Sequence, residues 1–185
     1  MPGPLADLDL QAMLAREDAA AALFAELREG LVRDAGCRFL TASVYDLERM
    51  RSRRVYTDDA EIYGLGNFKR VDENRYFDTV IRGAQPFFST TIEEIAEVFF
   101  DWEKIRRMGF ESNLNIPAVA DGRVIGTANL LAEKGHFDAR RVARAMEWQP
   151  VVTLCFLLLT LRDPETATFH PGHRLTHAAE PAVEG

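Results

Sequence analysis

The sequence predicts an α+β fold, in which one antiparallel β-sheet carries long helices on one face and short helices and loops over a pocket on the other. Three observations lead to this prediction. Apolar residues recur at helical spacing near both ends of the chain, two pairs of segments alternate with period two across short turns, and the middle has little regular pattern. Short turns join antiparallel strands, because a parallel pair needs a crossover of about a dozen residues.

The first helix is expected at residues 9–33 as one continuous amphipathic element. Apolar residues recur there every three or four positions, with charged residues between them. Asp9, or alternatively Asp7, can cap its first turn by accepting a backbone N–H. Gly36 ends the connection to the next segment.

Two strands are expected next, at residues 38–46 and 54–58, joined by an arginine-rich turn that is typical of a solvated hairpin. Alternation makes one face of the first strand apolar and the other polar. The polar face either lines a pocket or is partly exposed. Leu40, Ala42 and Val44 share the apolar face, and Thr41, Ser43 and Tyr45 share the polar face.

The middle of the chain is expected to hold loops and short elements. Residues 59–76 are predicted as loop and 76–83 as a short helix, and residues 85–89 form an edge strand because Pro86 has no N–H for a strand ladder. Two short helices follow. The first is opened at Thr91 by a capping box and runs to residue 100, and the second covers residues 101–109.

The strongest local pattern is a β-hairpin, with strands at residues 112–120 and 123–132 and a tight turn at Asp121-Gly122. Directly opposed residues of a hairpin share a face. A regular register places the pair Asn113 and Asn115 on one face of the hairpin. It places these residues of the second strand beside them: Val124, Gly126, Ala128 and Leu130.

The last helix is expected at residues 138–161, kinked or divided by Pro150. Its second half is apolar nearly all round and therefore needs cover on more than one side. Residues 1–162 are interpreted as a single domain. Residues 163–185 lack periodicity and contain several prolines, and we expect a flexible tail.

Composition narrows the classes of function. The 185 residues carry 22 Lys and Arg against 29 Asp and Glu, a formal net charge of −7, which argues against a nucleic-acid partner. Two cysteines cannot form a disulfide framework, so a reducing cytoplasm is expected. No apolar run approaches the roughly 20 residues that span a bilayer, so no membrane partner is expected.

The hairpin carries a family resemblance. The letters MGFESNLNIP at residues 108–117, followed by DGRVIGT at 121–127, resemble the signature of GAF domains, and the order of elements over residues 9–161 matches too. The resemblance implies a GAF/PAS-like sheet with a ligand pocket, small-molecule ligands such as cyclic nucleotides, tetrapyrroles, haem or amino-acid-like metabolites, and dimerisation through terminal helices. More narrowly, the chain looks like small bacterial proteins that consist of little besides one GAF domain.

Candidate ligand-binding residues are polar or aromatic side chains expected around this pocket. GAF photoreceptors place small polar residues toward their chromophore where Asn113 and Asn115 stand, so the resemblance assigns this face to the pocket. The two amides either bind a polar ligand there or form hydrogen bonds with the middle loops. Asn129 falls on the opposite face unless a bulge re-aims it. Asp101 either holds a ligand amine or simply caps its helix, and Lys69 and Arg54 can complement an anion. The residues assigned to the site are Asn113, Asn115, Tyr45, Ser43, Tyr56, Phe88, Asp101, Trp102 and Asn129.

No catalytic or metal constellation is expected. Cys37 and Cys155 lie in apolar surroundings, away from the middle segment, so a thiol-dependent methionine sulfoxide reductase, one enzymatic branch of the GAF fold, is the weakest hypothesis. The histidines at 170, 173 and 177 are interrupted by Pro171 and Gly172 and are not assigned a metal.

The first hypothesis is therefore a non-enzymatic cytoplasmic sensor with a small-molecule ligand and no other cofactor. An interaction module that forms a homodimer through its terminal helices is the alternative.

Overall fold

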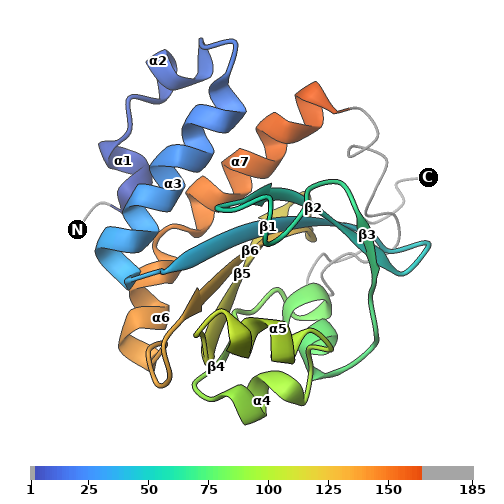
Figure 1. Cartoon of the computed structure of the whole chain (residues 1–185). Coiled ribbons are helices and arrows are strands. Elements are labelled where there is room, and N and C mark those ends of the chain that lie inside the picture. The colour runs from blue at the N-terminus through green and yellow to red at the C-terminus, as the bar shows by residue number, and fades with distance from the viewer. Residues whose placement is uncertain (1–2, 164–185) are drawn as a thin grey trace, which may run out of the picture.

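The computed structural model describes residues 3–163 and shows one six-stranded antiparallel sheet (Figure 1). The strand order is β3-β2-β1-β6-β5-β4, so the two hairpins meet along β1 and β6 at the centre of the sheet. This confirms the predicted α+β class. The strands are β1 (Phe39–Asp46), β2 (Arg51–Thr57), β3 (Phe68–Arg70), β4 (Phe87–Ser89), β5 (Ser112–Ala120) and β6 (Arg123–Ala132).

Helices cover the two faces of the sheet unequally (Figure 1). The long helices α3 (Ala19–Ala35) and α7 (Gln149–Arg162) lie side by side on one face, with α6 (Ala139–Met146) at their end. The other face meets only short elements of the middle segment, and this asymmetry leaves room for a cavity there. These elements are the π-helix η1 (Phe77–Arg82), α4 (Ile92–Ala96) and α5 (Trp102–Arg107).

The predicted continuous N-terminal helix is wrong. It is divided into α1 (Pro4–Asp7), α2 (Leu10–Leu14) and α3. The Asp9 carboxylate caps α2 by accepting the Ala12 N–H at 3.0 Å. Arg16 then closes a turn on the Asp18 carboxylate at 2.7 Å, before α3 begins. The apolar spacing continues across this turn, which is why periodicity did not reveal the break.

The C-terminal helix is divided, as Pro150 indicated. It breaks after α6, and Pro150 lies in the first turn of α7, where a missing N–H costs no hydrogen bond. Within residues 3–163, no single helix is long and apolar enough to cross a bilayer. Only α6 and α7 together meet the length and composition, as a pair bent by 47°. The expected tail lies outside the described residues, apart from Asp163.

The main core lies between the sheet and the long helices. The apolar face of β1 points into it as predicted, and α3 and α7 fill it from the other side. Gly126 of β6 lets the Phe156 ring approach the sheet, because a Cβ at this position would lie 2.3 Å from the ring. The fully buried members include Leu23, Leu27, Leu31, Leu40, Leu114, Ile116, Leu130 and Phe156.

A β-bulge in the second hairpin corrects the predicted register. Ala118 pairs with Gly126 and Val119 with Val124, so Ile125 is an extra residue on β6. The bulge reverses the faces of β6 beyond it. Asn129 therefore stands opposite Asn115 and shares its face, whereas Gly126 and its alternate neighbours turn to the long helices.

The middle segment is more structured than predicted. A short strand, β3, pairs with β2 inside the expected loop, and β2 begins at Arg51, within the expected turn. The first short helix ends at Ala96 rather than at residue 100. Thr91 caps that helix as predicted, but the Glu94 carboxylate accepts the N–H of Thr90 instead of Thr91. The arginines at 51, 53 and 54 thus belong to the sheet, and Arg54 lines its cavity side.

Candidate functional site

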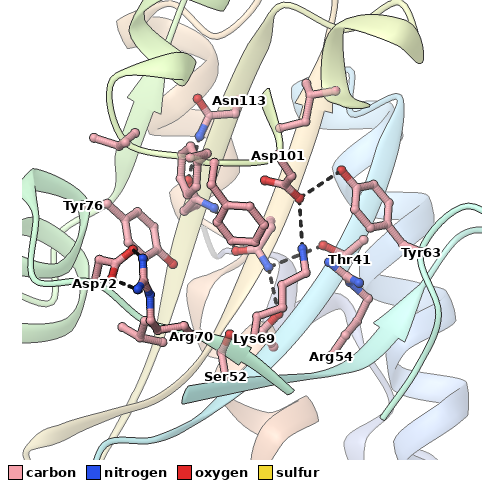
Figure 2. A pocket seen from close by; sticks show the side chains of 18 of the residues that line it. Thr41, Ser52, Arg54, Tyr63, Lys69, Arg70, Asp72, Tyr76, Asp101 and Asn113 are labelled. Carbon is pink, nitrogen blue, oxygen red and sulfur yellow. Dashed lines mark hydrogen bonds and ion pairs between the residues drawn. The ribbon is translucent and has the colours of Figure 1, made fainter. Parts of the chain in front are cut away.

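A cavity of about 160 Å³ lies between the sheet and the middle segment. Its floor is formed by β1, β5 and β6, one wall by β2 and β3, and its cover by the chain around η1 and α5 (Figure 2). The lining combines hydroxyls, amides and charged groups with aromatic rings. The floor residues are Thr41, Ser43, Tyr45, Asn113, Asn115 and Asn129, and the charged residues are Arg54, Lys69, Arg70, Asp72 and Asp101.

Three asparagines form a hydrogen-bonded ladder across the floor. The Asn113 amide donates to the Asn115 carbonyl at 2.7 Å, and the Asn115 amide donates to the Asn129 carbonyl at 2.8 Å. The Asn129 amide lies 3.4 Å from the Thr41 hydroxyl and 3.5 Å from the Ser43 hydroxyl. The ladder ends at the Asn113 Oδ1 atom, which is buried and has no hydrogen-bond partner. An unsatisfied buried acceptor favours a ligand that donates a hydrogen bond.

A cluster of three hydroxyls borders the ladder. The Tyr45 hydroxyl lies 2.6 Å from that of Tyr76 and 2.8 Å from that of Thr127. Burial raises the pKa of Tyr45 and raises that of Tyr76 well above its usual value. Both phenols therefore stay protonated and neutral at pH 7, and they can exchange hydrogen bonds with a ligand without changing charge. Tyr76 was missed by sequence reasoning because it stands alone at the start of a short helix.

Asp101 faces the cavity instead of capping its helix. It occupies the position before α5, yet its side chain accepts no hydrogen bond from the first turn. Its carboxylate accepts hydrogen bonds from the Lys69 ammonium at 2.9 Å and the Tyr63 hydroxyl at 3.4 Å (Figure 2). Burial and this carboxylate raise the pKa of Tyr63, so the phenol remains a donor. The capping interpretation is wrong, and the pair links β3 to α5 across the cavity.

Arg54 is the least satisfied charged group of the site. Its guanidinium lies 4.3 Å from the centre of the Tyr63 ring, and its one hydrogen bond is a long contact to the Gly64 carbonyl at 3.4 Å. The buried Nε atom has no hydrogen-bond partner. Within residues 3–163, no carboxylate lies within ion-pair distance of Arg54, whereas Lys69 pairs with Asp101 and Arg70 with Asp72. Burial lowers the pKa of Arg54 from its usual value.

A second bulge decides which residues of β2 face the cavity. Ala42 pairs with Tyr56 and Ser43 with Arg54, so Val55 is the extra residue. In a regular strand, positions 54 and 56 would share a face. The bulge sends Arg54 to the cavity and Tyr56 to the helix side of the sheet.

The structure brings six of the nine assigned residues together: Asn113, Asn115, Asn129, Ser43, Tyr45 and Asp101. The other three do not line the cavity. Tyr56 stacks on Phe24 of α3, with ring centres 4.8 Å apart. Phe88 pairs with Leu114 on the opposite face of the sheet and is 41% exposed. Trp102 borders a separate shallow depression beside α5, because the first turn of that helix points it away.

The thiols lie away from this site. Cys37 and Cys155 are both buried in the core beneath the long helices. Burial raises the pKa of Cys37 to about 12 and raises that of Cys155 further, which suppresses the reactive thiolate. Residues 3–163 contain no group of three or more metal-ligating side chains. The histidines at 170, 173 and 177 lie outside the described residues.

Structures of known proteins show what this architecture resembles. A GAF-domain/HD-domain protein from Geobacter sulfurreducens superposes with a TM-score of 0.59 and 15% identity, over 77% of this chain and 92% of that one. This chain has the GAF-domain fold. The GAF domain of a two-component sensor histidine kinase from Bacillus halodurans gives 0.61 and 10%, over 77% and 96%. The blue-light absorbing form of the PixJ GAF domain from Thermosynechococcus elongatus gives 0.56 and 14%, over 86% and 99%.

The likeness of this chain to other proteins is structural. No family-wide sequence profile and no curated protein matches the chain. At identities of 10–15%, the superpositions confirm the fold implied by the hairpin motif but do not identify a ligand for this chain.

Proposed function

We propose that this GAF domain is a non-enzymatic sensor that binds a small cytoplasmic metabolite in the cavity. The observation that carries the proposal is a lined cavity with two buried atoms that have no hydrogen-bond partner, Asn113 Oδ1 and Arg54 Nε. Buried polar groups without partners are costly in a core that serves packing alone. A bound metabolite satisfies them. The sensor kinase and photoreceptor among the structural neighbours support the same class of function.

The sheet connects the cavity to the long helices, so a change caused by ligand binding can reach the helix side of the molecule. Alternate residues of β1, β5 and β6 line the cavity, and their neighbours pack against α3 and α7. The cover packs on the sheet through two separate hydrophobic clusters, and the Lys69–Asp101 pair spans it from β3 to α5. A ligand that prefers one arrangement of this cover shifts the population of the whole domain toward it. The proposal is of binding without reaction, and it is supported by the two thiols, which are buried in the core on the other face of the sheet.

The sensor proposal predicts that a ligand stabilises the protein. We expect a compound at 100 times its dissociation constant to add about 2.7 kcal/mol to the free energy of unfolding. Native mass spectrometry of the purified chain identifies a co-purifying molecule, and thermal-shift screening covers nucleotides, amino acids, haem and purine- or hydantoin-like metabolites. If the chain purifies empty and no compound of any charge raises its melting temperature, the proposal fails.

We also propose that the domain, residues 1–162, forms a homodimer through its long helices. One side of α7 stays uncovered, with Leu157 42% and Leu161 80% exposed, and Val32 of the adjacent α3 is 41% exposed. Apolar helix faces of this kind are typical of self-association surfaces. We expect light scattering at micromolar concentration to give a dimer mass. The double substitution Leu157→Lys, Leu161→Lys is expected to give a folded monomer, and a monomeric parent protein would contradict the proposal.

A further inference from the structure

We infer that the cavity is specific for a small organic monoanion that also carries an N–H donor, with the carboxylate of the ligand at Arg54 and its N–H at Asn113. The inference rests on the proposed sensor function and names the chemical class of its ligand. Figure 2 shows that Arg54 and Asn113 lie on opposite sides of the site. The two groups thus define two ends of one ligand.

The charge of the lining sets the charge of the ligand. Three cationic side chains and two carboxylates line the cavity, which leaves one net positive charge. Lys69 and Arg70 form ion pairs with Asp101 and Asp72, whereas Arg54 has no carboxylate within ion-pair distance in residues 3–163 and only the more distant charge of Asp101 acts on it. A buried charge is costly unless it is paired. A guanidinium binds a carboxylate through two parallel N–H donors, and the Nε of Arg54 is a buried donor without a partner.

The amide ladder sets the other end of the ligand. Each asparagine amide along the floor donates toward the next, so the unsatisfied atom at Asn113 is an acceptor. Asn113 is 3% exposed, which leaves a ligand as its source of a hydrogen bond. Rotating all three amides by half a turn would leave a donor at this end instead. The experiment below separates these two directions.

Size and shape narrow the class further. A cavity of about 160 Å³ is close to the ~150 Å³ engineered cavity that holds one benzene molecule. A carboxylate on a small ring fits this volume, whereas haem or a tetrapyrrole requires the cover to move away. Tyr76 and Phe99 line the cavity with aromatic rings that pack edge-to-face, with centres 5.1 Å apart. These rings favour a planar, partly apolar ligand body.

Three ligands of nearly equal shape test the two ends separately. Pyrrole-3-carboxylate carries both the anion and the N–H, on opposite sides of its ring. Furan-3-carboxylate keeps the anion but replaces the N–H with an oxygen atom, and pyrrole-3-carboxamide keeps the N–H but is neutral. Titration calorimetry on the unmodified chain is expected to show that pyrrole-3-carboxylate binds about 10- to 100-fold more tightly than either analogue.

Substitutions connect each preference to its residue. Arg54→Gln is expected to abolish the preference for carboxylate over carboxamide, and Arg54→Lys to retain part of it. Asn113→Ala is expected to abolish the preference for pyrrole over furan. Arg49→Gln is the charge-matched control, because Arg49 lies on the same hairpin, is largely exposed and does not line the cavity. It is expected to leave all three affinities unchanged.

The outcomes distinguish this inference from the sensor function. Failure of pyrrole-3-carboxylate to bind at millimolar concentration overturns the inference, and so does equal binding of the carboxamide. If the furan binds more tightly than the pyrrole, the inference that the Asn113 carbonyl accepts an N–H from the ligand is overturned. In each case, a neutral or cationic molecule that co-purifies with the chain leaves the sensor proposal standing. Only a cavity that accepts no compound of any charge removes both.

Discussion

Phe156→Ala is expected to lower the free energy of unfolding by about 3–5 kcal/mol, the largest effect of any single substitution proposed for this protein. Phe156 is 1% exposed and joins α7 to the sheet. Its ring packs edge-on against Phe24 of α3, with centres 6.1 Å apart, and fills the space left by Gly126. Truncation leaves a cavity between α3, α7 and β6, and these three elements cannot move together to fill it. Urea denaturation followed by circular dichroism measures the loss.

The control for this substitution lies on the same helix. Leu161 is 80% exposed, so Leu161→Ala is expected to change the stability of the monomer by no more than about 0.5 kcal/mol. Both variants are compared at a concentration where each is monomeric, because a dimer contact at Leu161 would add its own contribution. Equal losses for the two variants would show that Phe156 is not a centre of the core.

Gly30→Ala is expected to destabilise the protein by about 1–3 kcal/mol, although alanine is the better helix former by about 1 kcal/mol. Gly30 lies inside α3, where the Trp148 ring crosses the helix. A Cβ at this position would lie 1.9 Å from Trp148 Cζ2, so the ring or the helix must move. The ring is also fixed by a hydrogen bond from its Nε1 to the Asp34 carboxylate at 3.0 Å. Thermal and urea unfolding measure the loss.

A double-mutant cycle tests the cause of this loss. Trp148→Phe removes the ring atoms that a Cβ at position 30 would meet, together with the bond to Asp34. In that background, Gly30→Ala is expected to be neutral or stabilising, because helix propensity then decides its sign. If Gly30→Ala stabilises the parent protein as well, the close approach of Trp148 to α3 does not constrain this helix.

The local sequence pattern was sufficient to predict an element wherever each of its faces keeps the same environment, buried or exposed, along its whole length. The faces of β1 were predicted correctly, because side chains of a strand alternate and one face is buried beneath α3 and α7. The second hairpin and the break at Pro150 were predicted for the same kind of reason, since turn chemistry and proline act within a few residues. The polar floor of the cavity, from Ser43 to Asn113, was therefore visible in the sequence.

Two bulges had no signal in the sequence, and they decide the composition of the site. The extra residue at Ile125 brings Asn129 beside Asn115, and the extra residue at Val55 turns Arg54 inward and Tyr56 outward. Each bulge interrupts the pairing inside one hairpin, where the sheet also packs against the helix layer. A bulge is selected by such packing rather than by local propensity, so alternation placed Asn129 on the wrong face, and the assignment of Tyr56 to the site was wrong as well.

The sequence by itself determined the class of fold, the hairpin and the supply of polar groups for one face of the sheet. Only the tertiary structure decided which charges are paired: Asp101 leaves its helix terminus for Lys69, which comes from a strand 32 residues earlier, and Arg54 is left without a carboxylate within residues 3–163. The physical reason is the distance along the chain over which each interaction acts. Periodicity and turns depend on neighbours along the chain, whereas the partner of a buried charge depends on segments that meet only after folding.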